Sequence, residues 1–207
     1  MKELEINFGM GVGLPWEKIT EGYMVKLDLM KSENDVFQQN KLKIIDAALS
    51  IEATLERMLL DYFFGGQIYE DVKRYEFENM VLSSSWFTFG NKHRLVITTL
   101  KNRGFLCKKD LDLLNSLLHK VAEYRNAFTH GKHKIDTPFC CLTHFKNESI
   151  DTELSDDYFI KMEKRFHDCN EILSFLSCRI GYTIGKYSKP PNQDYPSPPD
   201  CMKGKYD

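Results

Sequence analysis

Three side chains that can act on a phosphodiester lie close together in the second half of the chain. Arg125, Asn126 and His130 fall in residues 124–131, which read YRNAFTHG. An imidazole can transfer protons near neutral pH, and a guanidinium can hold two phosphate oxygens at once. The amide of Asn126 can orient either group. These residue types favour acid–base chemistry on a phosphodiester.

The three residues end the most regular helical pattern in the sequence, which begins near Asp110. Asn126 and His130 are four residues apart and share a helix face, whereas Arg125 and His130 lie roughly 140° apart around the axis and about 7.5 Å along it. Arg125 and His130 could both reach one phosphate-sized group. We expect Gly131 to cap this helix in the left-handed conformation. The apolar period of 3.6 comes from Leu111, Leu114, Leu117, Leu118, Val121, Tyr124 and Phe128.

A second interpretation of the same residues needs no chemistry. The helix dipole favours positive side chains near a helix C-terminus, so Arg125 and His130 could be surface residues with no further role. The local charge is nevertheless basic, since Lys and Arg outnumber Asp and Glu eight to three between Lys101 and Lys134. Spacing alone leaves both interpretations open.

Length and composition predict one soluble globular domain with terminal extensions. The 207 residues are 42% hydrophobic and 28% charged, which allows a core without disulfides. The net charge of −2 gives no overall signal for nucleic acid. No apolar run approaches about 18 residues, and no signal-peptide core follows the charged N-terminus. We therefore expect a cytoplasmic protein without a membrane segment, in which the six cysteines are reduced thiols.

The order of elements predicts an all-α protein, an up-down bundle of four to five helices with a small hairpin or irregular loop before the last helix. The first helix should begin near Ser32, where Asp35 completes a capping signal, and end before Gly65. Shorter helices are expected over 69–83 and 91–102, ahead of the helix that carries the motif.

The remaining segments complete the predicted order. Residues 132–152 lose the helical period and should form the hairpin or loop, and the last helix should begin at Ser155. We expect 1–31 to be an extended N-terminal arm, 32–185 the helical domain and 186–207 a flexible tail, because that tail holds five of the seven prolines.

Other sets of residues are weaker candidates for a site. A zinc site would have to draw on His130, His133, Cys140, Cys141 and His144, but adjacent cysteines match known ligand spacings poorly, so we expect no metal. No cysteine stands where a nucleophile would be activated, and no phosphate-binding loop motif is present.

Two further sets have a simple structural interpretation. The acidic residues Asp46, Glu52 and Glu56 on the first helix are expected to form a solvated face. The aromatic residues of the segment 86–89, Trp86, Phe87 and Phe89, could stack on bases, but bulky aromatic side chains after a helix break more often pack in a core or a dimer interface.

The motif and its surroundings resemble the HEPN superfamily. Residues 125–131, RNAFTHG, resemble the family signature of an arginine, four to six residues and a histidine at a helix end. Residues 51–63 look like its long first helix, and 89–92, FGNK, are similar to a recurrent element that opens a short helix. The resemblance covers about residues 32–184.

The resemblance implies a specific activity. HEPN proteins are α-helical bundles that usually dimerise, and many are metal-independent endoribonucleases without cofactors in toxin–antitoxin or antiviral systems. His130 would transfer the proton at the ribose 2′-OH or the leaving oxygen, Arg125 would stabilise the phosphate charge, and Asn126 would position the phosphate or the imidazole. The implied partners are RNA, a second copy of the chain and an antitoxin or other defence protein.

The resemblance also leaves alternatives. One HEPN branch, paired with a nucleotidyltransferase antitoxin, has a tyrosine two residues after the histidine, where this chain has Lys132. Other HEPN domains have lost catalysis and serve as binding modules for RNA, a nucleotide or a protein. The basic residues expected to contact RNA are Lys120, Lys132, His133 and Lys134.

Overall fold

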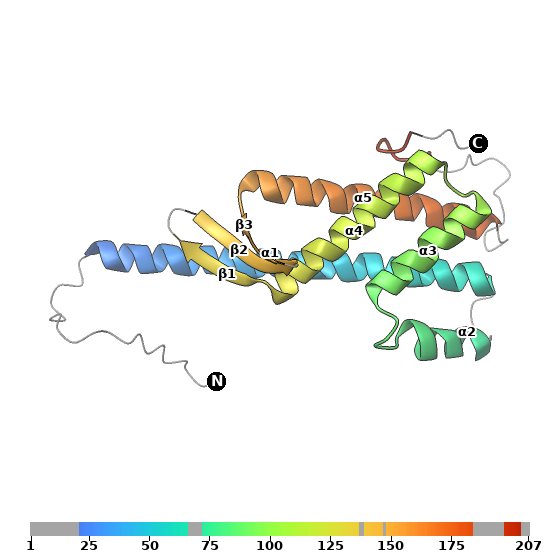
Figure 1. Ribbon diagram of the computed structural model, residues 1–207, viewed down its shortest axis with the longest axis horizontal. Coiled ribbons are helices and arrows are strands. Elements are labelled where there is room, and N and C mark those ends of the chain that lie inside the picture. The colour runs from blue at the N-terminus through green and yellow to red at the C-terminus, as the bar shows by residue number, and fades with distance from the viewer. Residues whose placement is uncertain (1–20, 66–71, 137–138, 147, 184–196, 204–207) are drawn as a thin grey trace. The chain divides into compact units, whose positions relative to one another are not determined.

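The computed structural model describes residues 21–65, 72–136, 139–146, 148–183 and 197–203, and the chain divides into two compact units, 1–38 and 39–207. The described part of the first unit, residues 21–38, is helical. The second unit is mostly helical with one small sheet, which confirms the predicted all-α class (Figure 1). The helices are α1 (Glu21–Phe64), α2 (Val72–Phe77), the π-helix η2 (Glu78–Leu82), α3 (Phe89–Arg103), α4 (Lys108–His130) and α5 (Asp156–Thr183).

Helix α1 begins at Glu21, so the predicted start near Ser32 is wrong, as is the extended arm over residues 21–31. No Gly or Pro occurs between residues 23 and 31, so nothing interrupts a helix ahead of Ser32. Residues 1–20 of the predicted arm lie outside the described residues. The end of α1 follows the prediction, because Gly65 takes the left-handed conformation with φ 69°.

Four helices, α1, α3, α4 and α5, contribute most of the core of the second unit. Each contributes apolar side chains at helical spacing, and α4 contacts both α3 and α5. Its most completely buried members include Leu55 and Leu59 of α1, Leu100 of α3, Leu114 and Leu118 of α4, and Leu173 and Leu176 of α5. The regular apolar stripe of α4 therefore places the helix in the middle of the core, as its period predicts. In the described part of the chain, no helix is long and apolar enough to cross a membrane.

A three-stranded antiparallel sheet follows α4 directly, where the sequence predicts a small hairpin or loop. The sheet has the order β1-β2-β3, and its middle strand contacts α4. Leu142 of β2 is fully buried, lies opposite His133 of β1 and opposite Thr152 of β3. The strands are β1 (Lys132–Asp136), β2 (Phe139–Lys146) and β3 (Glu148–Glu153).

Gly131 joins α4 to β1, and the prediction that it caps the helix in the left-handed conformation is wrong. Its φ is −71° and its ψ is 152°, an extended conformation that any residue can adopt. Space is the limiting factor, because a Cβ at this position would lie 2.2 Å from the Ala127 carbonyl oxygen and 2.8 Å from Leu142 Cδ1. The glycine lets the sheet pack closely against the last turn of α4.

Part of the predicted flexible tail packs on the second unit. Met202 is 9% exposed and belongs to the core, and the Lys203 amide donates a hydrogen bond to Asp110 Oδ1 at 2.8 Å. Asp110 is fully buried and also accepts a hydrogen bond from Cys107 Sγ. The tail prediction is therefore wrong for residues 197–203, because a buried carboxylate and an apolar side chain fix this proline-containing segment. Residues 184–196 and 204–207 lie outside the described residues.

Candidate functional site

A pocket of about 580 Å³ opens within the second unit beside the last turns of α4. Arg125, Asn126 and His130 all line it, so the structure brings the three predicted catalytic residues to one cavity. The opposite walls come from α1, from the start of α3 and from the loop between η2 and α3. Further lining residues include Glu52, Ser83, Ser84, Ser85, Phe87, Thr88, Lys92 and Thr129.

The register of α4 decides which side chains face this pocket. Ala127 and Phe128 are buried, which leaves Asn126 and His130 exposed at the rim and Arg125 with 32% of its side chain exposed. The Gly131 amide donates to the Ala127 carbonyl oxygen at 2.7 Å, so the helix stays closed up to His130. The imidazole therefore projects from an ordered last turn.

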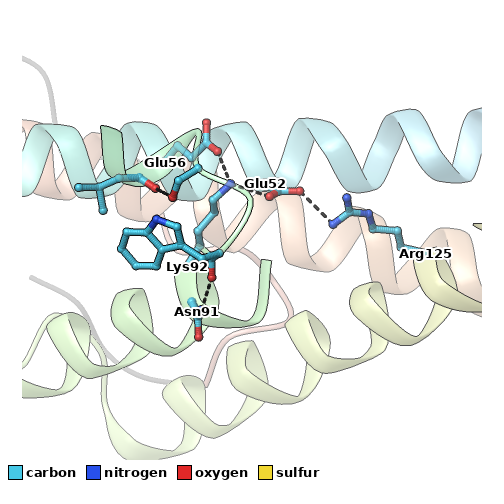
Figure 2. Close-up of polar contacts among 8 residues, drawn as sticks. Glu52, Glu56, Asn91, Lys92 and Arg125 are labelled. Atoms are coloured by element: carbon cyan, nitrogen blue, oxygen red, sulfur yellow. Dashed lines mark hydrogen bonds and ion pairs between the residues drawn. The ribbon is translucent and has the colours of Figure 1, made fainter. Parts of the chain in front are cut away.

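Arg125 is held by a carboxylate from a different helix. Its Nη1 donates to Glu52 Oε2 at 3.0 Å, and only 13% of the Glu52 side chain is exposed. The other oxygen of Glu52 accepts a hydrogen bond from Lys92 Nζ at 2.6 Å, and Lys92 also donates to Glu56 Oε1 at 2.5 Å. Figure 2 shows Glu52 between Lys92 and Arg125, so one carboxylate joins α1 to α3 and α4.

Lys92 is the buried cation of this network. Burial by itself lowers the pKa of Lys92, but the hydrogen bonds and charges of Glu52 and Glu56 outweigh that effect, so the pKa is raised above its ordinary value. The ammonium group is therefore charged at neutral pH. In the network of these four residues, two cations balance two carboxylates.

The prediction that Glu52 and Glu56 belong to a solvated face is wrong, whereas Asp46 is exposed as expected. Helical period alone cannot distinguish a charge facing water from one covered by another helix. One feature of the sequence indicates that Glu52 is covered by other residues. Glu52 lies at the edge of the apolar stripe, directly after Ile51 and three residues before Leu55, which are both buried.

The loop over residues 83–88 forms one wall of the pocket and is held in place by hydrogen bonds. Ser84 Oγ donates to the Val81 carbonyl oxygen at 2.5 Å, and Asn91 Nδ2 donates to the Trp86 carbonyl oxygen at 2.9 Å (Figure 2). Phe89 is buried in the core, and the partly buried Phe87 packs against the core, as the core interpretation predicts. Trp86 differs, since it is 62% exposed.

The basic residues expected to contact RNA lie on α4 and β1. Lys120 is half-exposed and donates to Glu123 at 2.6 Å on the surface of α4. Lys132 is exposed on β1, His133 is partly buried opposite Leu142, and Lys134 lies on β1, although its side chain is outside the described part. Among the side chains that the structure describes, those of Lys120, Lys132 and His133 do not line the cavity.

The residues considered for zinc do not form a cluster. Over the described ranges, no three His, Cys, Asp or Glu side chains lie together so that they could hold a metal ion.

No family model, curated protein or solved structure matches this chain. The geometry of the site places a partly exposed guanidinium, an amide and an imidazole around one cavity.

Proposed function

We propose that this pocket cleaves RNA without a metal and that the chain is a HEPN-like endoribonuclease of a cytoplasmic toxin–antitoxin or antiviral system. The observation that carries the proposal is that Arg125, Asn126 and His130 line one cavity. Each supplies a different part of the chemistry of phosphodiester cleavage.

His130 takes the proton from the ribose 2′-OH, and the 2′ oxygen attacks the adjacent phosphorus. The bond from phosphorus to the 5′ oxygen breaks, which leaves a 2′,3′-cyclic phosphate and a 5′-hydroxyl. The Arg125 guanidinium stabilises the negative charge that grows on the phosphate oxygens, and the Asn126 amide positions the phosphate. We propose that the chain acts as a homodimer, in which His130 of the second copy gives the proton to the leaving 5′ oxygen.

The experiment is an RNA cleavage assay in the presence of EDTA. Purified protein should cut total RNA and leave 2′,3′-cyclic phosphate ends, whereas His130→Ala should cut it about 10²- to 10⁴-fold more slowly. His167→Ala is the matched control, since His167 is exposed on α5 and does not line the pocket. Cleavage that stops in EDTA and returns with added magnesium would overturn the metal-independent mechanism.

A second candidate is a binding module that has no catalytic activity. It is favoured by the ion pair between Arg125 and Glu52, because the guanidinium is already partly satisfied before any ligand arrives. In that case RNA remains intact, and His130→Ala leaves the biological effect of the protein unchanged. Loss of that effect in a folded His130→Ala protein that still binds its partner favours the enzyme.

A further inference from the structure

The negative charge inside the pocket is unusual for a site that binds phosphate. Glu52 lines the same cavity as Arg125 and His130, and its carboxylate is 3.0 Å from the guanidinium. A phosphate bound to the remaining N–H groups of Arg125 would share that guanidinium with Glu52. It would therefore lie close to a fixed negative charge.

The second cation that lines the pocket cannot compensate for this charge. Lys92 is 5% exposed and its ammonium group is within 2.6 Å of both Glu52 and Glu56. Lys92 therefore pairs with the two carboxylates and not with a ligand. Together, Lys92 and Arg125 balance the charges of Glu52 and Glu56. A ligand entering the cavity meets one partly exposed guanidinium and no surplus of positive charge from this network.

We propose that Glu52 makes the pocket selective for singly charged phosphodiesters over doubly charged phosphomonoesters. This inference rests on the proposed function, because it assumes that a phosphate binds at Arg125. An internal RNA linkage carries one negative charge, whereas a terminal phosphate carries up to two near neutral pH. The carboxylate repels the second charge and thereby directs the site to the interior of an RNA strand.

Coulomb's law gives the size of the expected effect. The repulsion is proportional to the charge of the ligand, so removing Glu52 should strengthen dianion binding by the square of the factor for a monoanion. If Glu52→Gln improves binding of a monoanion by about threefold, it should improve binding of a dianion by about tenfold. A pocket without this selectivity would bind the dianion more tightly than the monoanion in the wild-type protein.

The test uses cytidine 2′,3′-cyclic phosphate, which has one negative charge, and cytidine 3′-monophosphate, which has two near pH 8. Dissociation constants are measured by calorimetry on the full chain at one ionic strength, because surface charges are screened by salt. Wild type should bind the cyclic ligand at least as tightly as the monophosphate. Glu52→Gln should shift the ratio of the two constants about threefold towards the monophosphate. Glu163→Gln, an exposed change on α5, should leave the ratio unchanged.

A measurement on the wild type alone covers the case in which Glu52→Gln does not fold. Lowering the pH towards 5 protonates the monophosphate, whose second pKa is about 6, but not the cyclic ligand. The monophosphate should then bind better relative to the cyclic ligand, whereas an ordinary cationic site would show a relative loss.

The outcomes separate this inference from the proposed function. Tighter binding of the dianion by the wild type, an unchanged ratio in Glu52→Gln, or binding of neither ligand would overturn the charge selectivity. If RNA is not cleaved but the selectivity is found, the enzyme proposal fails and the ligand class remains. If RNA is cleaved and the wild type prefers the dianion, only the role of Glu52 fails.

Discussion

At the scale of the single residue, a change at His130 distinguishes a catalytic site from a helix end that merely carries polar surface residues. The side chain is exposed, so His130→Ala should change the free energy of unfolding by no more than about 0.5 kcal/mol. Loss of a general acid or base should slow RNA cleavage about 10²- to 10⁴-fold. A cleavage assay and a thermal melt on the same preparation measure both effects. A melting temperature several degrees lower would identify His130 as a structural residue instead.

Arg125 should depend on shape as well as on charge. Arg125→Lys keeps the positive charge but loses the planar fork that can hold Glu52 and a phosphate together. We expect RNA cleavage to fall about 10- to 150-fold but to survive in part, because one good charge-assisted hydrogen bond is worth about 1.5–3 kcal/mol and about 1.4 kcal/mol is tenfold in rate. Arg94→Lys on the exposed face of α3 is the matched control. Activity equal to that of the wild type would show that the fork is not used.

The sequence identifies the motif residues but not the partners that surround them. Arg125, Asn126 and His130 can be found because their spacing on one helix is local information. The contacts of Arg125 with Glu52 and of Lys92 with Glu52 join residues 73 and 40 positions apart. Such pairs depend on how helices pack, which the period of each helix does not determine.

At the scale of the element, the junction between α4 and the sheet should tolerate no side chain at position 131. Gly131→Ala would bring a Cβ against the Ala127 carbonyl oxygen and Leu142, which should cost about 2 kcal/mol. That loss corresponds to a melting temperature about 4–8 °C lower for a chain of this size. Gly90→Ala is the control, because its Cβ would meet only Thr88 Oγ1 at 3.8 Å. Equal melting temperatures for the two variants would contradict this explanation.

This junction also shows why an element can be predicted while its details are not. The helical period over α4 and the loss of that period after Gly131 are local, and both are confirmed. The reason for the glycine is not local, since Leu142 comes from β2 and meets the helix only after the sheet has formed. The start of α1 was missed for a different reason, because a capping signal at Ser32 does not stop a helix already under way.

At the scale of the whole molecule, the segment 197–203 should contribute measurably to stability. Met202→Ala should cost about 2 kcal/mol, because the side chain is 9% exposed within the core. Met80→Ala, at a methionine that is 70% exposed, should cost less than about 0.5 kcal/mol. Urea unfolding of both variants measures the difference. If they match, the segment is not part of the cooperative unit.

Alkaline pH should weaken the fold through the buried thiol of Cys169 and the partly buried phenol of Tyr158. Burial raises the pKa of Cys169 from 9.0 to about 12, and burial together with Tyr124 raises the pKa of Tyr158 from 10.0 to about 12. As the pH rises, the unfolded chain releases these protons at a lower pH than the folded chain does. The stability that the two protonated groups contribute is therefore complete below pH 9 and is lost between about pH 9 and 12. Tyr158→Phe should lose less stability than the wild type between pH 10 and about 12 in urea titrations.

The hydrogen bond from Lys203 to Asp110 has a consequence for how the protein is made. The two residues are 93 positions apart, so at about 5–20 residues per second the ribosome needs roughly 5 to 20 s after Asp110 before its buried partner exists. During that interval the Asp110 carboxylate can accept the hydrogen bond from Cys107 Sγ but not the one from the Lys203 amide. The contact between α4 and residues 197–203 can therefore form only after α5 has been synthesised.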